Sequence, residues 1–275
     1  MFSLPVSETW GSPLTCGPDE IHIWLAYSAD ITDADLLARY KRWLNPEEAK
    51  KQQRFYFEKD RHQYLVTRGF IRSLLTRYVP HIQPAMWQFE TNEYGRPHIK
   101  PDPDIPKLHF NISHTKGLVA IAVTFDREIG IDVETVTRDG DQVGIADRFF
   151  SAAEVAELHT LPRVRQKDRF FDYWTLKESY IKARGMGLSI PLGDFSFLLG
   201  PPPQIGIDIV PKQNDNPERW AFRTWRLSQI HKMALTVERK AGRGLDLRIR
   251  ETVPLSHSRL AQPDVLYDSL RSETP

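Results

Sequence analysis

Three carboxylates and a lysine, divided between two short motifs, have the spacing to form one reactive site. Asp132 and Glu134 stand two residues apart in an expected strand over 130–134, so their side chains point to the same face. Glu178 and Lys182 stand four residues apart in an expected helix and therefore also share a face. If the two faces meet, three carboxylates and one cation surround a single point, which suits a Mg²⁺ ion that holds a phosphate.

Each motif also has a purely structural explanation. The two strand acids could mark the end of a strand that reaches solvent, where Asp and Glu are common. Glu178 and Lys182 could form a surface ion pair in the favourable order along a helix, worth only ~0.3–0.5 kcal/mol. Considered alone, each motif favours its structural explanation, and only their order and joint spacing favour a shared site.

Composition narrows the setting of such a site. The chain has 275 residues, of which 40% are apolar and 27% charged, as is usual for a soluble globular protein. The formal net charge of +1 gives no argument for nucleic acid or a membrane as a partner. The single cysteine, Cys16, cannot form an internal disulfide, and no apolar run approaches the length of a membrane span. Because residues 1–10 also lack the pattern of a signal peptide, we expect a cytoplasmic protein.

Hydrophobic periodicity predicts an α+β fold in two similar halves. The first half has an expected helix over 60–78, and Asn45 followed by proline predicts the start of another helix before it. The second half has an expected helix over 170–183, ended by Gly185. Strands are expected at 21–27, 118–125, 129–133, 195–199, 205–209, 220–227 and 233–238.

The similar pattern of the two halves predicts a pseudo-duplicated protein of two subdomains, each an antiparallel sheet with a long helix. We place the N-terminal subdomain at 1–128, the C-terminal subdomain at 129–253 and a loosely held tail at 254–275, where the patterning is weak. A chain that forms the cleft between both halves by itself is expected to act as a monomer.

Three further motifs could supply contacts to an anion. Residues 95–97 read Gly-Arg-Pro, and residues 110–114 place a serine and a histidine in Phe-Asn-Ile-Ser-His. Lys50, Lys51 and Arg54 could lie along one helix face. A turn with a solvated arginine, a neutral capping role and a solvated basic face are the structural alternatives, and each is acceptable singly.

Four of these motifs, in their order along the chain, resemble the 4′-phosphopantetheinyl transferase superfamily and in particular its larger, Sfp-like branch. The family pattern has a G-[KR]-P turn, an F-N-[IL]-S-H segment, a G-[IV]-D-[IV]-E strand and a W-[ST]-x-K-E-[AS]-x-x-K helix. This chain has all four, at 95–97, 110–114, 130–134 and 174–182. The resemblance runs from residue 45 to residue 197, and its last two motifs together are the most specific.

The resemblance implies that the protein moves the 4′-phosphopantetheine arm of coenzyme A onto a serine of an apo acyl or peptidyl carrier protein and releases 3′,5′-ADP. It implies Mg²⁺ at Asp132, Glu134 and Glu178. It implies catalysis by Lys182 and by Glu178, which would act as general base directly or through a water. The implied coenzyme contacts are Lys51, by spacing alone, Arg96, Ser113, His114, Asp132 and Lys182.

Two rival classes and the identity of the carrier stay open at this point. A non-catalytic module that binds coenzyme A or a carrier would be favoured by a missing acid, but all three are present. A different Mg²⁺-dependent phosphotransferase would be expected to carry a G-x-x-x-x-G-K-[ST] loop, which the chain lacks. Fatty-acid, polyketide and non-ribosomal peptide carriers all remain possible targets. The basic run over 163–169 could meet an acidic carrier or could be a solvated face.

Overall fold

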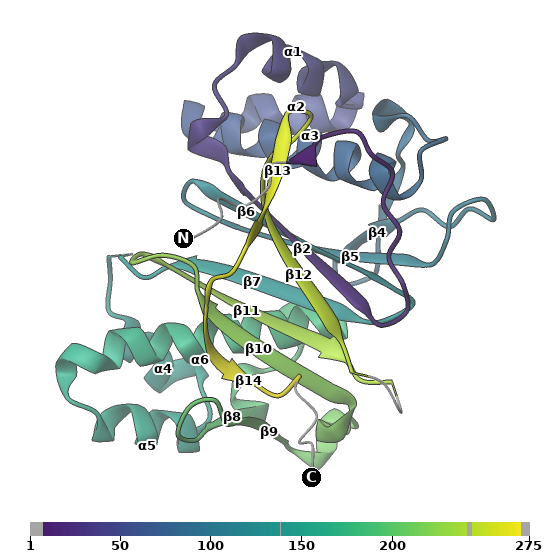
Figure 1. Cartoon of the computed structure of the whole chain (residues 1–275). Helices are drawn as coiled ribbons and strands as arrows, with labels where there is room; N and C mark the ends of the chain where they lie inside the picture. Colours follow the sequence, from purple (N-terminus) through teal and green to yellow (C-terminus); the bar gives the residue numbers. More distant parts are fainter. Residues whose placement is uncertain (1–7, 138, 241–243, 271–275) are drawn as a thin grey trace, which may run out of the picture.

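Two β-sheets lie face to face, and helices cover the outer face of each (Figure 1). The computed structural model describes residues 8–137, 139–240 and 244–270. Residues 1–7, most of the stretch in which we predict no signal peptide, and 271–275 of the predicted tail lie outside the described residues. In the described part of the chain, no helix is both long and apolar enough to cross a membrane.

The first sheet has six strands in the order β1-β13-β12-β2-β6-β5. Its neighbours pair antiparallel except β12 and β2, which run parallel. Three helices and a small hairpin, β3–β4, accompany it. The bounds are β1 Glu8–Thr9, β2 Glu20–Tyr27, α1 Ala34–Trp43, α2 Pro46–Arg54, α3 Glu58–Tyr78, β3 Phe89–Thr91, β4 Pro97–Ile99, β5 Leu108–Thr115, β6 Leu118–Phe125, β12 Asp246–Val253 and β13 His257–Ala261.

The second sheet has four antiparallel strands in the order β14-β10-β11-β7. The longest of its three helices covers it, and the other two helices and a second small hairpin, β8–β9, pack against that helix. The bounds are β7 Ile129–Thr135, α4 Gln142–Phe149, α5 Ala152–Thr160, α6 Arg163–Arg184, β8 Phe195–Leu199, β9 Ile205–Ile209, β10 Trp220–Arg226, β11 His231–Glu238 and β14 Asp264–Asp268. Short 3₁₀ helices lie at Ser28–Asp30, Pro84–Met86, Gly187–Ser189, Leu192–Asp194, Pro211–Gln213 and Pro217–Arg219.

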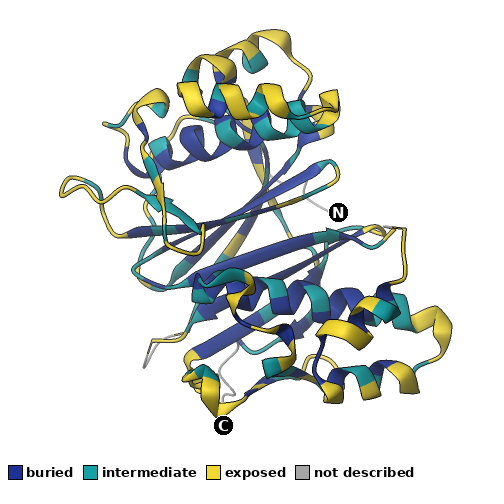
Figure 2. Cartoon of the chain, turned by 180° about the vertical axis from the view of Figure 1, so that it is seen from behind, coloured by how far each residue is buried: buried dark blue, intermediate teal, exposed yellow. Residues whose placement is uncertain are grey.

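Three apolar cores fill the spaces between these layers. One lies under α3 and includes Trp24 and Phe70, and another lies under α6 and includes Tyr180 and Phe222. The third lies between the sheets, where β2 and β6 meet β7 and β11. Figure 2 shows the consequence: the strands are buried, while the helices expose their outer faces. The predicted α+β fold, with a sheet and a long helix in each half, is confirmed.

Local signals in the sequence explain where several helices begin and end. Asn45 caps α2, and its side chain and that of Glu48 satisfy each other's backbone N–H groups. Ser151 and Glu154 form the same reciprocal cap at the start of α5. Gly185 ends α6 in the left-handed conformation, with φ of 70°. By contrast, α6 begins at Arg163, well before the expected position 170, so the basic run forms its first turns.

The prediction of a loosely held tail after residue 253 is wrong for the described part. β13 pairs with β12 and β1 in the first sheet, and β14 pairs with β10 in the second. Their apolar pattern is weak because they bury few side chains, mainly Ser258 in β13 and Tyr267 in β14, and backbone pairing holds them instead. β12, which we placed in the C-terminal subdomain, joins the first sheet, and the boundary at 128/129 stays a prediction.

Candidate active site

The predicted meeting of strand and helix faces occurs because a glycine lets α6 lie against β7. A Cβ at Gly130 would stand 2.0 Å from the carbonyl oxygen of Ser179 and 2.4 Å from the backbone nitrogen of Ala183. No side chain fits there, so the helix approaches the strand closely. Asp132 and Glu134 share the face of Gly130 because strand residues alternate, and both therefore face α6.

Lys182 of α6 forms an ion pair with Asp132 of β7. Its Nζ lies 2.6 Å from Oδ1 of Asp132, 3.1 Å from Oγ of Ser113 and 3.3 Å from the carbonyl oxygen of Ile131. Ser113 of β5 in turn donates to Oδ1 of Asp132 at 2.8 Å. Asp132 and Ser113 are buried, whereas Lys182 is partly open to solvent. Side chains from both halves of the protein therefore meet at one carboxylate.

Glu178 and Glu134 extend the cluster along the same face. Burial, together with the neighbouring charges of Asp132 and Glu134, raises the pKa of the Glu178 carboxyl to about 7, although Lys182 opposes the shift. Glu134 accepts a hydrogen bond from Nε1 of Trp174 at 3.2 Å. Asp132 and Glu134 are therefore near enough to Glu178 for their negative charge to act on it, and such a concentration of negative charge attracts a cation.

The donor chemistry of this cluster fits Mg²⁺. Oδ2 of Asp132 is buried and has no hydrogen-bond partner, which leaves an oxygen available to a ligand. Carboxylate oxygens are the protein ligands that Mg²⁺ prefers. Among the described residues, however, no three His, Cys, Asp or Glu side chains stand close enough together to hold a metal, and Lys182 neutralises Asp132 instead.

His114 lies next to this cluster and opens to solvent. It follows Ser113 on β5, and its side chain is exposed. Partial desolvation, and then the charge of Lys182, lower the pKa of its imidazole. A neutral ring with two distinct nitrogens can donate one hydrogen bond and accept another.

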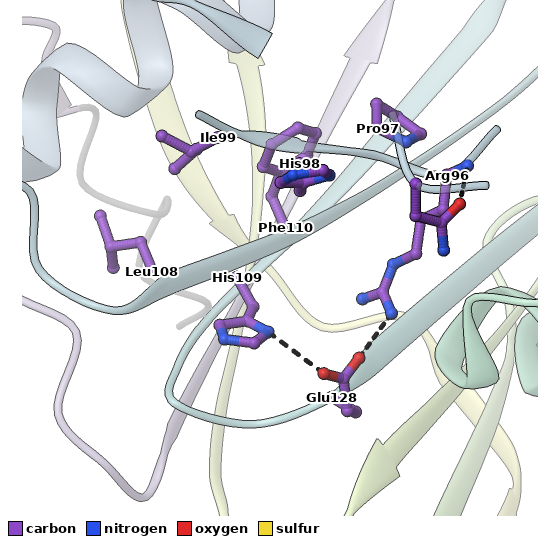
Figure 3. A pocket seen from close by; sticks show the side chains of 9 residues that line it. Arg96, Pro97, His98, Ile99, Leu108, His109, Phe110 and Glu128 are labelled. Carbon is purple, nitrogen blue, oxygen red and sulfur yellow. Dashed lines mark hydrogen bonds and ion pairs between the residues drawn. The ribbon is translucent and has the colours of Figure 1, made fainter. Parts of the chain in front are cut away.

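Arg96 lies at the far end of the contact between β7 and α6. Its Nη1 bonds Oε2 of Glu128 at 2.5 Å and the carbonyl of Ala183 at 3.1 Å, and its Nη2 bonds the carbonyl of Ile129 at 3.2 Å. Figure 3 shows Arg96 and His109 both directed at Glu128 in a pocket of about 310 Å³. The sequence did not single out Glu128, because an acid in a hairpin turn carries no distinctive signal.

Lys51 stands apart from this cluster. It lies on α2, with its Nζ 5.8 Å from the centroid of the Tyr64 ring. There it lines a depression of about 530 Å³ with Arg54, Phe55 and other residues of α2 and α3. Asp132 and Lys182 do not line this depression. The structure thus groups five predicted residues, Ser113, His114, Asp132, Glu178 and Lys182, with Glu134 beside them, and sets Arg96 and Lys51 further out.

Comparison with known proteins assigns the chain to a family. The model of the 4′-phosphopantetheinyl transferase superfamily matches residues 128–238, and the model of the 4′-phosphopantetheinyl transferase N-terminal region matches residues 32–126. The chain is 36% identical over 198 residues to 4′-phosphopantetheinyl transferase Sfp of Bacillus subtilis, a match that covers 72% of this chain and 83% of that protein. It is 34% identical to 4′-phosphopantetheinyl transferase HetI of Nostoc, over 64% of this chain and 73% of that protein. The chain therefore belongs to the 4′-phosphopantetheinyl transferase superfamily and is an enzyme of that class.

Proposed function

We propose that this enzyme transfers the 4′-phosphopantetheine arm of coenzyme A to a serine of an apo acyl or peptidyl carrier protein, in a Mg²⁺-dependent reaction that releases 3′,5′-ADP. Family membership supports the reaction class. The observation that supports the site is the contact of Lys182 with both Asp132 and Ser113, because it joins three of the family's motifs at one point.

Asp132, Glu134 and Glu178 are the proposed metal ligands. The bound ion would neutralise charge on the pyrophosphate of the coenzyme. The buried, unpartnered Oδ2 of Asp132 is the oxygen that supports this role most directly. Burial, and then the nearby charges of Asp132 and Glu134, raise the pKa of Glu178, and a cation drawn to this negative charge would relieve the repulsion.

Lys182, Ser113 and His114 are the proposed contacts to the phosphates of the coenzyme. Lys182 has three potential donors and is partly exposed, so its Nζ can reach a phosphate oxygen while it stays near Asp132. Ser113 and His114 are consecutive on β5: Ser113 donates to Asp132, and the charges of Lys182 and Asp132 act on the imidazole of His114. Arg96, at the end of the same contact, and Lys51, on α2, are proposed to bind more distant parts of the coenzyme.

Glu178 is the proposed general base for the hydroxyl of the carrier serine, either directly or through a water. Most of the rate enhancement in phosphoryl-type transfer comes from positioning and charge stabilisation. The rigid packing of α6 on β7 therefore matters as much as the base. We keep the expectation that the enzyme is a cytoplasmic monomer, and the exposed start of α6, with Arg163 and Arg165, remains a candidate contact for an acidic carrier.

Mass spectrometry of an apo carrier tests this proposal. The enzyme is incubated with coenzyme A, Mg²⁺ and several apo carriers from fatty-acid, polyketide and non-ribosomal peptide assembly. Addition of the arm's mass to the carrier, together with stoichiometric 3′,5′-ADP, supports the proposal. If the protein binds coenzyme A but none of the carriers gains mass, it is instead a binding module.

A further inference from the structure

The edge of β7 that faces the first half is satisfied by side chains and not by a neighbouring backbone. β7 and β5 are the terminal strands of their two sheets. Oδ1 of Asn111 accepts the N–H of Ile131 at 2.9 Å, and Oγ of Ser113 accepts the N–H of Val133 at 3.2 Å. Oγ1 of Thr115 accepts the N–H of Thr135 at 3.2 Å.

These three bonds form one regular series. The acceptors stand at alternate residues of β5, the donors stand at alternate residues of β7, and each pair is 20 residues apart in the chain. A constant offset means that the two strands run parallel and in a single register. Thr115 and Thr135 add a hydroxyl–hydroxyl bond of 2.9 Å at one end. Because a side chain intervenes at each step, the strands stand further apart than the roughly 4.8 Å of a backbone ladder.

Two carbonyl groups of β7 are satisfied in the same way. The carbonyl of Ile129 accepts from Arg96, and that of Ile131 accepts from Lys182. Ser113 accepts the middle bond of the series, and its hydroxyl also donates to Asp132. The register of β5 against β7 therefore sets where Ser113 and His114 stand relative to Asp132.

We propose that Asn111 and Thr115 are positioning residues for the transfer reaction: they flank Ser113 and hold β5 in register with β7, so that the groups from the two halves are aligned before the coenzyme binds. The inference rests on the proposed function, because it assumes that the coenzyme contacts both strands. Asn111 is buried, and it is the polar member of the Phe-Asn-Ile-Ser-His motif to which the proposed chemistry gives no role. Loss of either bond would let the strands shift. Part of the binding free energy of the coenzyme would then be used to align them, and its affinity would fall.

Steady-state kinetics of matched variants tests the proposal. Thr115→Val removes the hydroxyl with little change in shape, whereas Thr115→Ser retains it. Asn111→Leu removes the amide acceptor. Thr115→Val and Asn111→Leu are expected to raise KM for coenzyme A about tenfold with kcat changed less than about threefold, and Thr115→Ser should stay within about twofold of the original enzyme.

Thr124→Val is the matched control for loss of a hydroxyl. Thr124 is buried in β6 and bonds the carbonyl of Glu20 within the first sheet, so its loss can lower the melting temperature without affecting the register. If Thr115→Val lowers the melting temperature as Thr124→Val does but leaves KM for coenzyme A unchanged, the side chain is merely structural and the proposal is overturned. An original enzyme that transfers nothing to any carrier would instead refute the proposed function.

Amide hydrogen exchange on the unsubstituted protein covers the case in which the variants do not fold. The N–H groups of Ile131, Val133 and Thr135 should be protected in the absence of coenzyme A, because the proposal requires the register to exist beforehand. Free exchange at these three amides, with protection gained only on addition of coenzyme A, would contradict the proposal.

Discussion

Nζ of Lys182 lies 2.6 Å from Oδ1 of Asp132, and this pair joins the last turns of α6 to the middle of β7. Asp132 is nearly inaccessible to solvent, whereas Lys182 keeps about a quarter of its side-chain surface exposed, at 27%. The partly exposed lysine compensates the charge of the buried carboxylate, and its Nζ can still reach an anionic ligand. The pair therefore links the stability of the site to its chemistry.

Lys182→Ala should lower kcat by roughly a hundredfold, because it removes a positioned charge from the place where the phosphate is bound. Lys182→Arg keeps the charge but changes its shape and reach, so it should restore only part of the rate. Single-turnover transfer to an apo carrier measures both. A Lys182→Ala enzyme with normal rate and normal affinity for coenzyme A would reduce the residue to a structural ion pair.

Gly130→Ala should destabilise the fold by about 3 kcal/mol, because a methyl group would collide with the backbone of α6. Any fraction that stays folded should also lose activity, since α6 carries Glu178 and Lys182. Gly206→Ala is the control, because nothing lies within 4 Å of its added carbon, and it should be neutral or slightly stabilising. Urea unfolding of both variants gives the comparison, and equal stabilities would refute the packing argument.

The sequence predicts which side chains carry the chemistry of this site better than it predicts the backbone contacts and the strands around them. Asp132 and Glu178 follow from residue types and helical and strand periods, and the structure does place them near each other. The structural network around Arg96 could not be foreseen, because it depends on backbone carbonyls of β7 and α6 that any residues could supply. β13 and β14 were missed for a related reason: both bury few side chains and are held by backbone pairing, which leaves little apolar pattern.

Lys177→Met should cost about 3–5 kcal/mol of unfolding free energy, because it leaves the carboxylate of Glu154 buried without its cation. Both side chains are almost wholly inaccessible, their charged atoms lie 2.6 Å apart, and Lys177 also bonds two carbonyl groups. Lys212→Met breaks the pair between a well-exposed lysine and Asp194 and should cost less than about 1 kcal/mol. Chemical denaturation of the two variants tests this, and similar losses would count against the importance of burial.

Acidification should destabilise the protein through His22. Burial lowers the pKa of its imidazole from 6.5 to about 4, and its Nδ1 lies 2.7 Å from Oη of Tyr78. Between these two pH values the unfolded chain binds more protons at this position than the folded one, so stability falls as the pH falls. The expected loss of unfolding free energy due to His22 between pH 7 and pH 5 is about 2 kcal/mol.

Denaturation curves at several pH values check this contribution, with His22→Asn as the comparison. The substituted protein no longer titrates at this position, so its stability should fall less steeply below pH 6.5. The same slope in both proteins would show that other groups cause the acid sensitivity.

The most direct test of the central claim is the transfer assay with Asp132→Asn over a range of Mg²⁺ concentrations. Asparagine keeps the shape of the side chain and can still bond Ser113, but it removes the charge that is proposed to hold the ion and to pair with Lys182. We expect a folded protein that adds no arm to an apo carrier at Mg²⁺ concentrations sufficient for the original enzyme, while chelation of Mg²⁺ stops the original enzyme as well. Near-normal transfer by Asp132→Asn at limiting Mg²⁺ would show that the Asp132 carboxylate does not hold the ion.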